Sequence, residues 1–204
     1  MNLQQKAYNN ITAFILAGGK GKRLTHKKSL IQIDKKPLIL QTVIDLLSIF
    51  SKVILVSDSR ELYSFLDVPI YEDIIKNIGP LGGIYTGLNI SETDWNFFIA
   101  CDMPFINLDI IEILTENISD KYDCIIPYIN GYYEPLFALY NKCATKYISS
   151  SIRQNKYKIQ SFFKNINIKE ICEAEFKGID NIERTFVNIN TKNDVKDLRK
   201  LIKN

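Results

Sequence analysis

The feature that most constrains this chain is an apolar run that ends in glycines and is followed directly by cations. Residues 11–16 (ITAFIL) are apolar or compatible with a strand, Ala17, Gly18 and Gly19 follow, and five lysines or arginines lie within residues 20–28. Glycine adopts positive φ easily and lets backbone N–H groups approach an anion without a Cβ in the way. Cations neutralise the charge that those N–H groups orient. The pattern predicts a buried strand that leads into a phosphate-binding turn.

The alternative is a solvated basic loop that contacts nucleic acid. Such a loop has no need of a buried strand and a glycine pair directly before it. The net charge of the whole chain is only +3, and basic residues elsewhere are too sparse to form a track for a polyanion. The spacing of the glycines at 18, 19 and 21 does not fit the dinucleotide fingerprint, and the Walker A pattern is also absent. We therefore expect no nucleic-acid partner.

Composition limits the class of protein. The chain has 204 residues, 46% hydrophobic and 24% charged, which fits one globular domain over 1–204 with a polar N-terminal tail at 1–10. The four cysteines are far apart and form no C-x-x-C pair, which predicts reduced core cysteines rather than a metal site or disulfides. No segment approaches the ~18 continuous apolar residues of a membrane span. We expect a cytoplasmic protein without a membrane partner.

Strand-like and helix-like segments alternate along the chain. Continuous apolar runs predict buried strands at 52–56 and 95–100, and residues 107–117 have helical periodicity. The Asn130-Gly131 pair is typical of a tight β-hairpin turn. This alternation predicts a single-domain α/β fold of three layers, a mostly parallel sheet covered by helices on both faces.

Asp102 is the strongest candidate for a functional carboxylate. It follows the predicted strand 95–100, and Pro104 forces the chain to leave the sheet just after it. A carboxylate at the carboxyl edge of such a sheet can hold a hard cation such as Mg²⁺ through oxygen. The alternative is that Asp102 caps the helix beginning near Leu108, but Asn107 is better placed for that cap.

Other polar or glycine-rich segments fall at the ends of predicted strands. Ser57 begins a polar cluster after the strand 52–56, and residues 185–190 read as a strand ending in Asn188 and Asn190. Residues 79–83 (GPLGG) predict a turn into a helix, whose first N–H groups can bind a purine edge or an anion. An ordinary strand–helix connection explains the GPLGG segment equally well from its residues alone.

The chain resembles nucleotidyltransferases with a Rossmann-like fold, and within them the molybdenum cofactor guanylyltransferase family. Residues on the family's signature are Leu16 to Gly19, Arg23, Leu24 and Lys28; the further motifs are GPLGG, CDMPF at 101–105, EPLFALY at 134–140 and FVNINTKNDV at 186–195. Two positions depart from the signature. Thr25 stands where the family has Gly, and Lys27 where it has Asp.

This resemblance implies a nucleotidyltransferase that moves GMP from GTP to molybdenum-bound molybdopterin and releases pyrophosphate. Residues implied to contact GTP are Leu16, Ala17, Gly18, Gly19, Lys28, Ser57, Asp73, Gly79, Gly82 and Asp102. Asp102 is implied to hold Mg²⁺, and Arg23 with Lys28 to stabilise the leaving pyrophosphate. Asn188 and Asn190 are implied to face the pterin. Delivery proteins or target apoenzymes of the molybdenum cofactor are further implied partners.

Two other functions remain open from the sequence. One is a related enzyme that uses CTP or a sugar-phosphate acceptor. The other is a non-catalytic nucleotide-binding module, which the departures at Thr25 and Lys27 make plausible. Like charges on adjacent lysines repel. We expect Lys27 to face solvent and Lys28 to meet the phosphates, the alternative being a second phosphate contact from Lys27.

Overall fold

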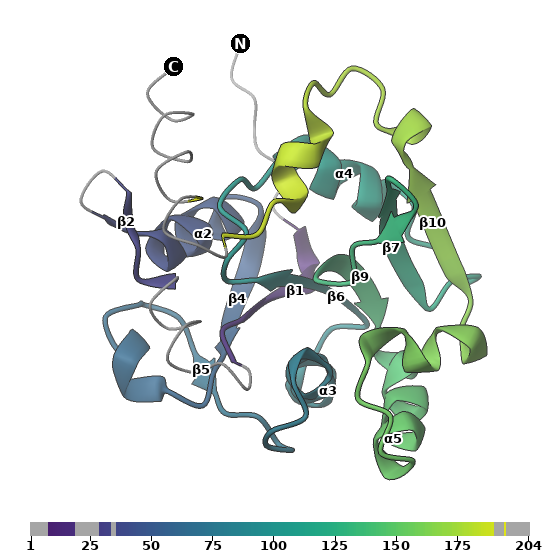
Figure 1. Ribbon diagram of the computed structural model, residues 1–204, viewed down its shortest axis with the longest axis horizontal. Helices are drawn as coiled ribbons and strands as arrows, with labels where there is room; N and C mark the ends of the chain where they lie inside the picture. The colour runs from purple at the N-terminus through teal and green to yellow at the C-terminus, as the bar shows by residue number, and fades with distance from the viewer. Residues whose placement is uncertain (1–7, 19–28, 34–35, 190–193, 195–204) are drawn as a thin grey trace.

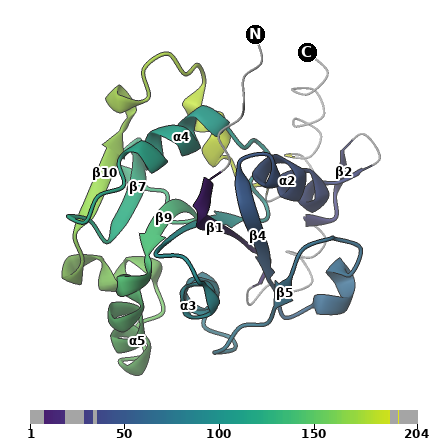
Figure 2. The ribbon, with the colours of Figure 1, turned by 180° about the vertical axis from the view of Figure 1, so that it is seen from behind.

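A mixed eight-stranded sheet forms the centre of the protein. The computed structural model describes residues 8–18, 29–33, 36–189 and 194. Its strand order is β10-β7-β9-β6-β1-β4-β5, with β8 paired to β7 (Figures 1 and 2). The strands are β1 Tyr8–Leu16, β4 Phe50–Val56, β5 Ile70–Tyr71, β6 Trp95–Ala100, β7 Cys124–Ile129, β8 Tyr132–Tyr133, β9 Phe137–Asn141 and β10 Ile168–Cys172. A separate two-stranded sheet joins β2 Gln32–Ile33 to β3 Lys36–Pro37.

The predicted three layers are confirmed. Within the described residues, the α-helices are α2 Leu38–Leu47, α3 Pro80–Ile90, α4 Leu108–Glu116 and α5 Thr145–Arg153. Successive side chains of a strand point to opposite faces, so Ala13 and Ile15 of β1 join the core under α2 and α4, whereas Phe14 and Leu16 join the core over α3 and α5. Figure 1 shows α3 and α5 on the opposite side of the sheet from α4. Short 3₁₀ segments complete the chain: η1 Arg60–Tyr63, η2 Lys142–Ala144, η3 Ile159–Asn165, η4 Glu173–Glu175 and η5 Ile182–Phe186.

Strand direction decides which residues meet. β6, β1, β4 and β5 run parallel, so their carboxyl ends lie at one edge of the sheet. β9 runs antiparallel to β6, with Phe137 opposite Ile99. The beginning of β9 therefore lies at the same edge as the end of β6.

The hairpin at Asn130-Gly131 is confirmed. Both residues have positive φ, 51° and 83°, and Tyr128 pairs with Tyr133 across the turn. Positive φ at both central positions is the type I′ geometry that suits the twist of paired strands.

Three sequence predictions were wrong. β1 begins at Tyr8, so residues 8–10 belong to a strand and not to the polar tail that was predicted for residues 1–10. Residues 185–189, the described part of the strand predicted for 185–190, do not form a strand, because Thr185 and Phe186 belong to η5, and Asn188 follows it in irregular backbone. All four cysteines are free as predicted, but Cys143 and Cys172 are exposed rather than in the core. Among the described helices, none is long and apolar enough to cross a membrane.

Candidate active site

The carboxyl ends of β1, β4 and β6 are held together by hydrogen bonds that extend beyond the strands. The N–H of Ala17 donates to the carbonyl of Val56 (2.9 Å), and the N–H of Cys101 donates to the carbonyl of Leu16 (3.1 Å). The hydroxyl of Ser57 donates to the carbonyl of Ala17 (3.0 Å). These bonds fix the path of the backbone into Gly18, where the sequence predicts the phosphate-binding turn.

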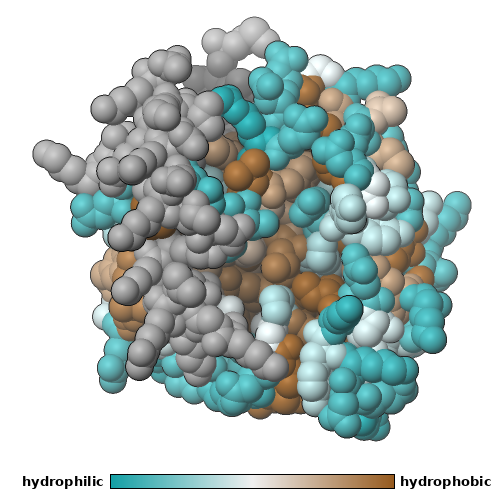
Figure 3. Space-filling view, in the orientation of Figure 1, coloured by the Kyte–Doolittle hydropathy of each residue, from teal (hydrophilic) through white to brown (hydrophobic). Residues whose placement is uncertain are grey.

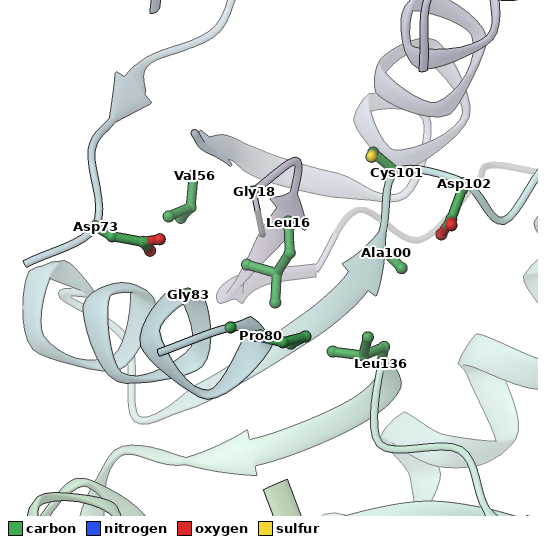
Figure 4. A pocket seen from close by; sticks show the side chains of 11 residues that line it. Leu16, Gly18, Val56, Asp73, Pro80, Gly83, Ala100, Cys101, Asp102 and Leu136 are labelled. Atoms are coloured by element: carbon green, nitrogen blue, oxygen red, sulfur yellow. The ribbon is translucent and has the colours of Figure 1, made fainter. Parts of the chain in front are cut away.

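A pocket opens at this edge of the sheet (Figure 4), and Figure 3 shows apolar side chains gathered across the middle of this face of the molecule. Its lining comes from β1, β4, β6, the segment after β5, the start of α3 and the start of β9. The lining residues are Leu16, Gly18, Val56, Asp73, Gly79, Pro80, Gly83, Ala100, Cys101, Asp102 and Leu136. In the view of Figure 4, Asp73 and Asp102 lie on opposite sides of the pocket, with Leu16 between them.

The start of α3 is brought to the pocket by close packing. Gly79 precedes the helix with φ of 73°, a conformation that glycine adopts without strain, and Pro80 takes the first helical position. A Cβ on Gly83 would lie 2.9 Å from Cδ2 of Leu16, and a Cβ on Gly87 would lie 2.6 Å from Cε1 of Phe98. A larger residue at either position would force the side chain of Leu16 or Phe98 to shift, so the two glycines let the helix lie this close to β1 and β6.

Asp73 is held on the side of the pocket next to β4 and β5. It is partly buried, and its Oδ2 would lie 3.6 Å from a Cβ placed on Gly18. The next residue, Ile74, donates its N–H to the hydroxyl of Thr86 on α3 (2.9 Å). Asp73 is thus placed by a contact with α3 rather than by a free loop.

Asp102 lies in the loop after β6, as predicted. It is partly buried, and its carbonyl accepts a hydrogen bond from the N–H of Ile189 (2.9 Å). Asn107, not Asp102, caps α4, because its side chain accepts from the N–H groups of Asp109 (2.9 Å) and Ile110 (3.3 Å). The capping alternative for Asp102 is excluded.

Around Asp102 the described residues do not provide a complete set of metal ligands. Within the ranges that the structure describes, no group of three or more histidine, cysteine or acidic side chains could hold an ion. Mg²⁺ commonly binds to proteins through one or two carboxylates, and water and substrate phosphates complete its coordination. A single carboxylate beside a pocket that receives substrate phosphates would fit that pattern.

The predicted site residues divide into three groups. Leu16, Gly18, Asp73, Gly79 and Asp102 line one pocket. Ala17, Ser57, Gly82 and Asn188 do not. Ser57 is fully buried and also accepts from the N–H of Ser59 (3.2 Å), Gly82 is packed against Ile78, and Asn188 is exposed in the irregular backbone after η5. The predictions for Gly19, Arg23, Thr25, Lys27, Lys28 and Asn190 lie outside the described residues.

The lining residues that were not predicted from the sequence are Val56, Pro80, Gly83, Ala100, Cys101 and Leu136. Cys101 and Leu136 lie inside the motifs CDMPF and EPLFALY, so the motifs themselves carried the signal. Leu136 reaches the pocket because β9 returns antiparallel to β6, and its carbonyl accepts from the N–H of Ala100 (3.0 Å).

Comparison with known proteins agrees with this geometry. A family model described as a MobA-like NTP transferase domain matches residues 13–169. A probable molybdenum cofactor guanylyltransferase from Natranaerobius thermophilus is 33% identical over 199 residues, which are 95% of this chain and 97% of the relative. One from Peptoclostridium acidaminophilum is 36% identical over 191 residues, 91% of this chain and 86% of the relative.

A solved structure shares the fold closely. The crystal structure of molybdopterin-guanine dinucleotide biosynthesis protein A from Archaeoglobus fulgidus matches with a TM-score of 0.81 and 25% identity. The match covers 94% of this chain and 98% of that one. Fold and site together define a nucleotidyltransferase with a mixed, mostly parallel sheet. The chain belongs to the MobA-like NTP transferase family, among the molybdenum cofactor guanylyltransferases.

Proposed function

We propose that this protein transfers GMP from GTP to molybdenum-bound molybdopterin, giving the guanine dinucleotide form of the cofactor and pyrophosphate. The observation that carries the proposal is one pocket at the carboxyl edge of the sheet, with Asp73 and Asp102 on its two sides and Gly18 in its lining. The names of the relatives that match along nearly their whole length support the same reaction.

Asp73 suits guanine better than the other bases. Guanine presents two adjacent donors, N1–H and the 2-amino group, which one carboxylate can accept together. Adenine and cytosine instead present a donor beside an acceptor, and an acceptor that faces a carboxylate is left unpaired, which costs about 1–3 kcal/mol when buried. This chemistry favours GTP over the alternative substrate CTP.

Phosphate transfer needs positioning and charge neutralisation more than covalent chemistry. A phosphate oxygen of the acceptor forms a bond to the α-phosphorus of GTP. The bond from that phosphorus to the bridging oxygen breaks, and pyrophosphate leaves with the electron pair. The turn at Gly18 would orient the phosphates, and by family resemblance Arg23 and Lys28 would stabilise the departing pyrophosphate.

Asp102 is the proposed protein ligand of Mg²⁺. When bound, the ion supplies charge neutralisation on the phosphate oxygens. The position of Asp102 supports this role, because it lies at the sheet edge between the Asp73 side and the start of β9. Asn188, one residue before the Ile189 that is bonded to Asp102, is proposed to face the pterin, together with Asn190.

A cytoplasmic location is part of the proposal. The four free cysteines support it, because thiols persist in a reducing compartment.

Calorimetric titration of the protein with GTP, CTP and ATP in the presence of Mg²⁺ tests the nucleotide assignment. We expect GTP to bind at least about 10-fold more tightly than either competitor, which corresponds to about 1.4 kcal/mol. Equal affinities for the three nucleotides would contradict guanine selection by this pocket.

A further inference from the structure

Glu134 lies in the tight turn that joins β8 to β9. Its N–H donates to the carbonyl of Pro127 (3.0 Å), and its own carbonyl accepts from the N–H of Phe137 (3.0 Å). Two residues after it, Leu136 lines the pocket and is bonded through its carbonyl to Ala100, two residues before Asp102. The backbone of Glu134 is therefore fixed close to the site.

A distant segment closes the same side of the site. The ring of Phe186 packs edge-on against that of Phe137 with 5.5 Å between centroids, and the N–H of Ile189 donates to the carbonyl of Asp102. Residues 186–189 thus run from the start of β9 to Asp102. Sheet order places this side opposite Asp73, because β9 and β5 lie on either side of β6, β1 and β4.

The neighbouring acidic side chains already have structural partners. Glu170 accepts from the hydroxyl of Tyr133, Glu173 accepts from the N–H of Asn130 (2.6 Å), and Glu175 accepts from the N–H of Cys172 (2.9 Å). Glu134 differs from them. It is partly buried, and within the described part of the chain its carboxyl makes no hydrogen bond or ion pair.

Burial of this carboxyl without a donor penalises its charged form. The loss of solvent raises the pKa of Glu134 to about 7. Donors supplied by a ligand would stabilise the carboxylate, whereas an anionic ligand group would be repelled by it. The carboxyl of Glu134 therefore matches a neutral part of a substrate that carries N–H groups.

We propose that Glu134 determines specificity for the acceptor by accepting hydrogen bonds from the adjacent N–H and amino groups of its 2-amino-4-oxo pterin ring. This inference rests on the proposed function. The acceptor carries a negative phosphate at one end and the neutral pterin at the other. Holding the pterin at Glu134 orients the phosphate toward Asp102 and the α-phosphate of GTP. In this arrangement, Asp73 reads the guanine and Glu134 reads the pterin, since both rings present the same pair of donors.

The test compares KM for the two substrates in Glu134→Gln, with Glu112→Gln as the matched control on the exposed face of α4. Glutamine keeps the size of the side chain but turns a donor toward one of the pterin donors. We expect KM for molybdenum-bound molybdopterin to rise about 10-fold or more in E134Q, with KM for GTP unchanged within about two-fold. E112Q should leave both values unchanged.

An unchanged KM for the acceptor in E134Q, or an equal rise in KM for GTP, would overturn the assignment. Glu134→Asp is the second variant, because it keeps the charge and withdraws the carboxyl by one methylene; its KM for the acceptor should lie between wild type and E134Q. If E134Q does not fold, E134D provides the test, and a KM for the acceptor equal to that of the wild type would then count against the proposal. Failure of the wild-type protein to form any dinucleotide would instead reject the proposed function itself.

Discussion

The two sides of the pocket are built in different ways. On the nucleotide side, parallel strands β1 and β4 and the start of α3 supply the walls, and glycines at 83 and 87 set how closely the helix approaches the sheet. On the acceptor side, the turn at Glu134 and residues 186–189 come together through contacts between segments some 50 residues apart in sequence. The structure of the nucleotide side is therefore determined by local sequence motifs, whereas that of the acceptor side depends on tertiary packing. Asp102 lies between them and should serve both.

Removing the charge of Asp102 should have the largest effect, because both sides meet there. Asp102→Asn is expected to fold normally and to lower kcat for GMP transfer by about 100-fold or more, as expected when a charge-stabilising group is lost from a transfer site. Steady-state kinetics measures this effect. The control variant is Asp109→Asn, which changes an exposed acidic residue on α4. Near-normal turnover of D102N would remove Asp102 from the mechanism.

A change at Asp73 should affect the nucleotide side alone. Asp73→Asn keeps one acceptor but opposes a guanine donor with a donor, so we expect KM for GTP to rise about 10-fold while KM for the acceptor stays within two-fold. The exposed Asp67→Asn serves as the matched control before β5. If D73N raised both KM values equally, the two sides of the pocket would not bind their substrates independently.

Disturbing the close packing between α3 and the sheet should lower the stability of the protein. A Cβ at residue 87 would lie 2.6 Å from the ring of Phe98, which is fully buried and stacked on Phe14 with 5.0 Å between centroids. Gly87→Ala is expected to lower the free energy of unfolding by about 1–2 kcal/mol, since overpacking outweighs the better helix propensity of alanine. Urea denaturation measures this, and Asn89→Ala on the exposed face of α3 should change stability by less than about 0.5 kcal/mol. A stabilised G87A would show that the helix can shift.

The acceptor side should gain stability when its buried charge is removed. The pKa of Glu134 is about 7 in the folded protein against an ordinary 4.5, so the folded state holds the proton more tightly. The contribution of Glu134 to the stability of the wild type therefore falls as pH rises from about 4.5 through 7. The shift corresponds to roughly 3 kcal/mol at most, and to about 1 kcal/mol after solvent screening of a partly exposed carboxyl.

Thermal or urea unfolding of wild type and E134Q at pH 4 and pH 8 checks this sign. E134Q should match wild type at pH 4 and exceed it by about 1 kcal/mol at pH 8. A variant that is less stable at pH 8 would mean that the carboxylate of Glu134 has a stabilising partner in the free protein.

Local sequence was sufficient where local chemistry decides structure. Asn107 was identifiable as the cap of α4, and the Asn130-Gly131 pair as a hairpin turn, because each depends on residues within a few positions. The strand-then-glycine pattern likewise located Gly18 at the pocket. The alternation of segments was enough for the three layers.

The sequence was not sufficient to predict the structure where contacts between distant segments determine it. Residues 185–190 read as a strand, yet Phe186 packs on Phe137 within a 3₁₀ segment. Ser57 read as a ligand contact, yet its hydroxyl joins β4 to β1 through Ala17. Nothing near Glu134 in sequence reveals that β9 returns antiparallel to β6, which places the start of β9 at the edge of the sheet where Asp102 lies.

Transfer of label from GTP tests whether this protein is a guanylyltransferase. The wild-type protein is incubated with Mg²⁺, molybdenum-bound molybdopterin and GTP labelled with ³²P at either the α or the γ position. We expect α label to appear in the dinucleotide product and γ label in pyrophosphate, with CTP supplying little or no label. Absence of α label from the product, or equal incorporation from CTP, would contradict this expectation.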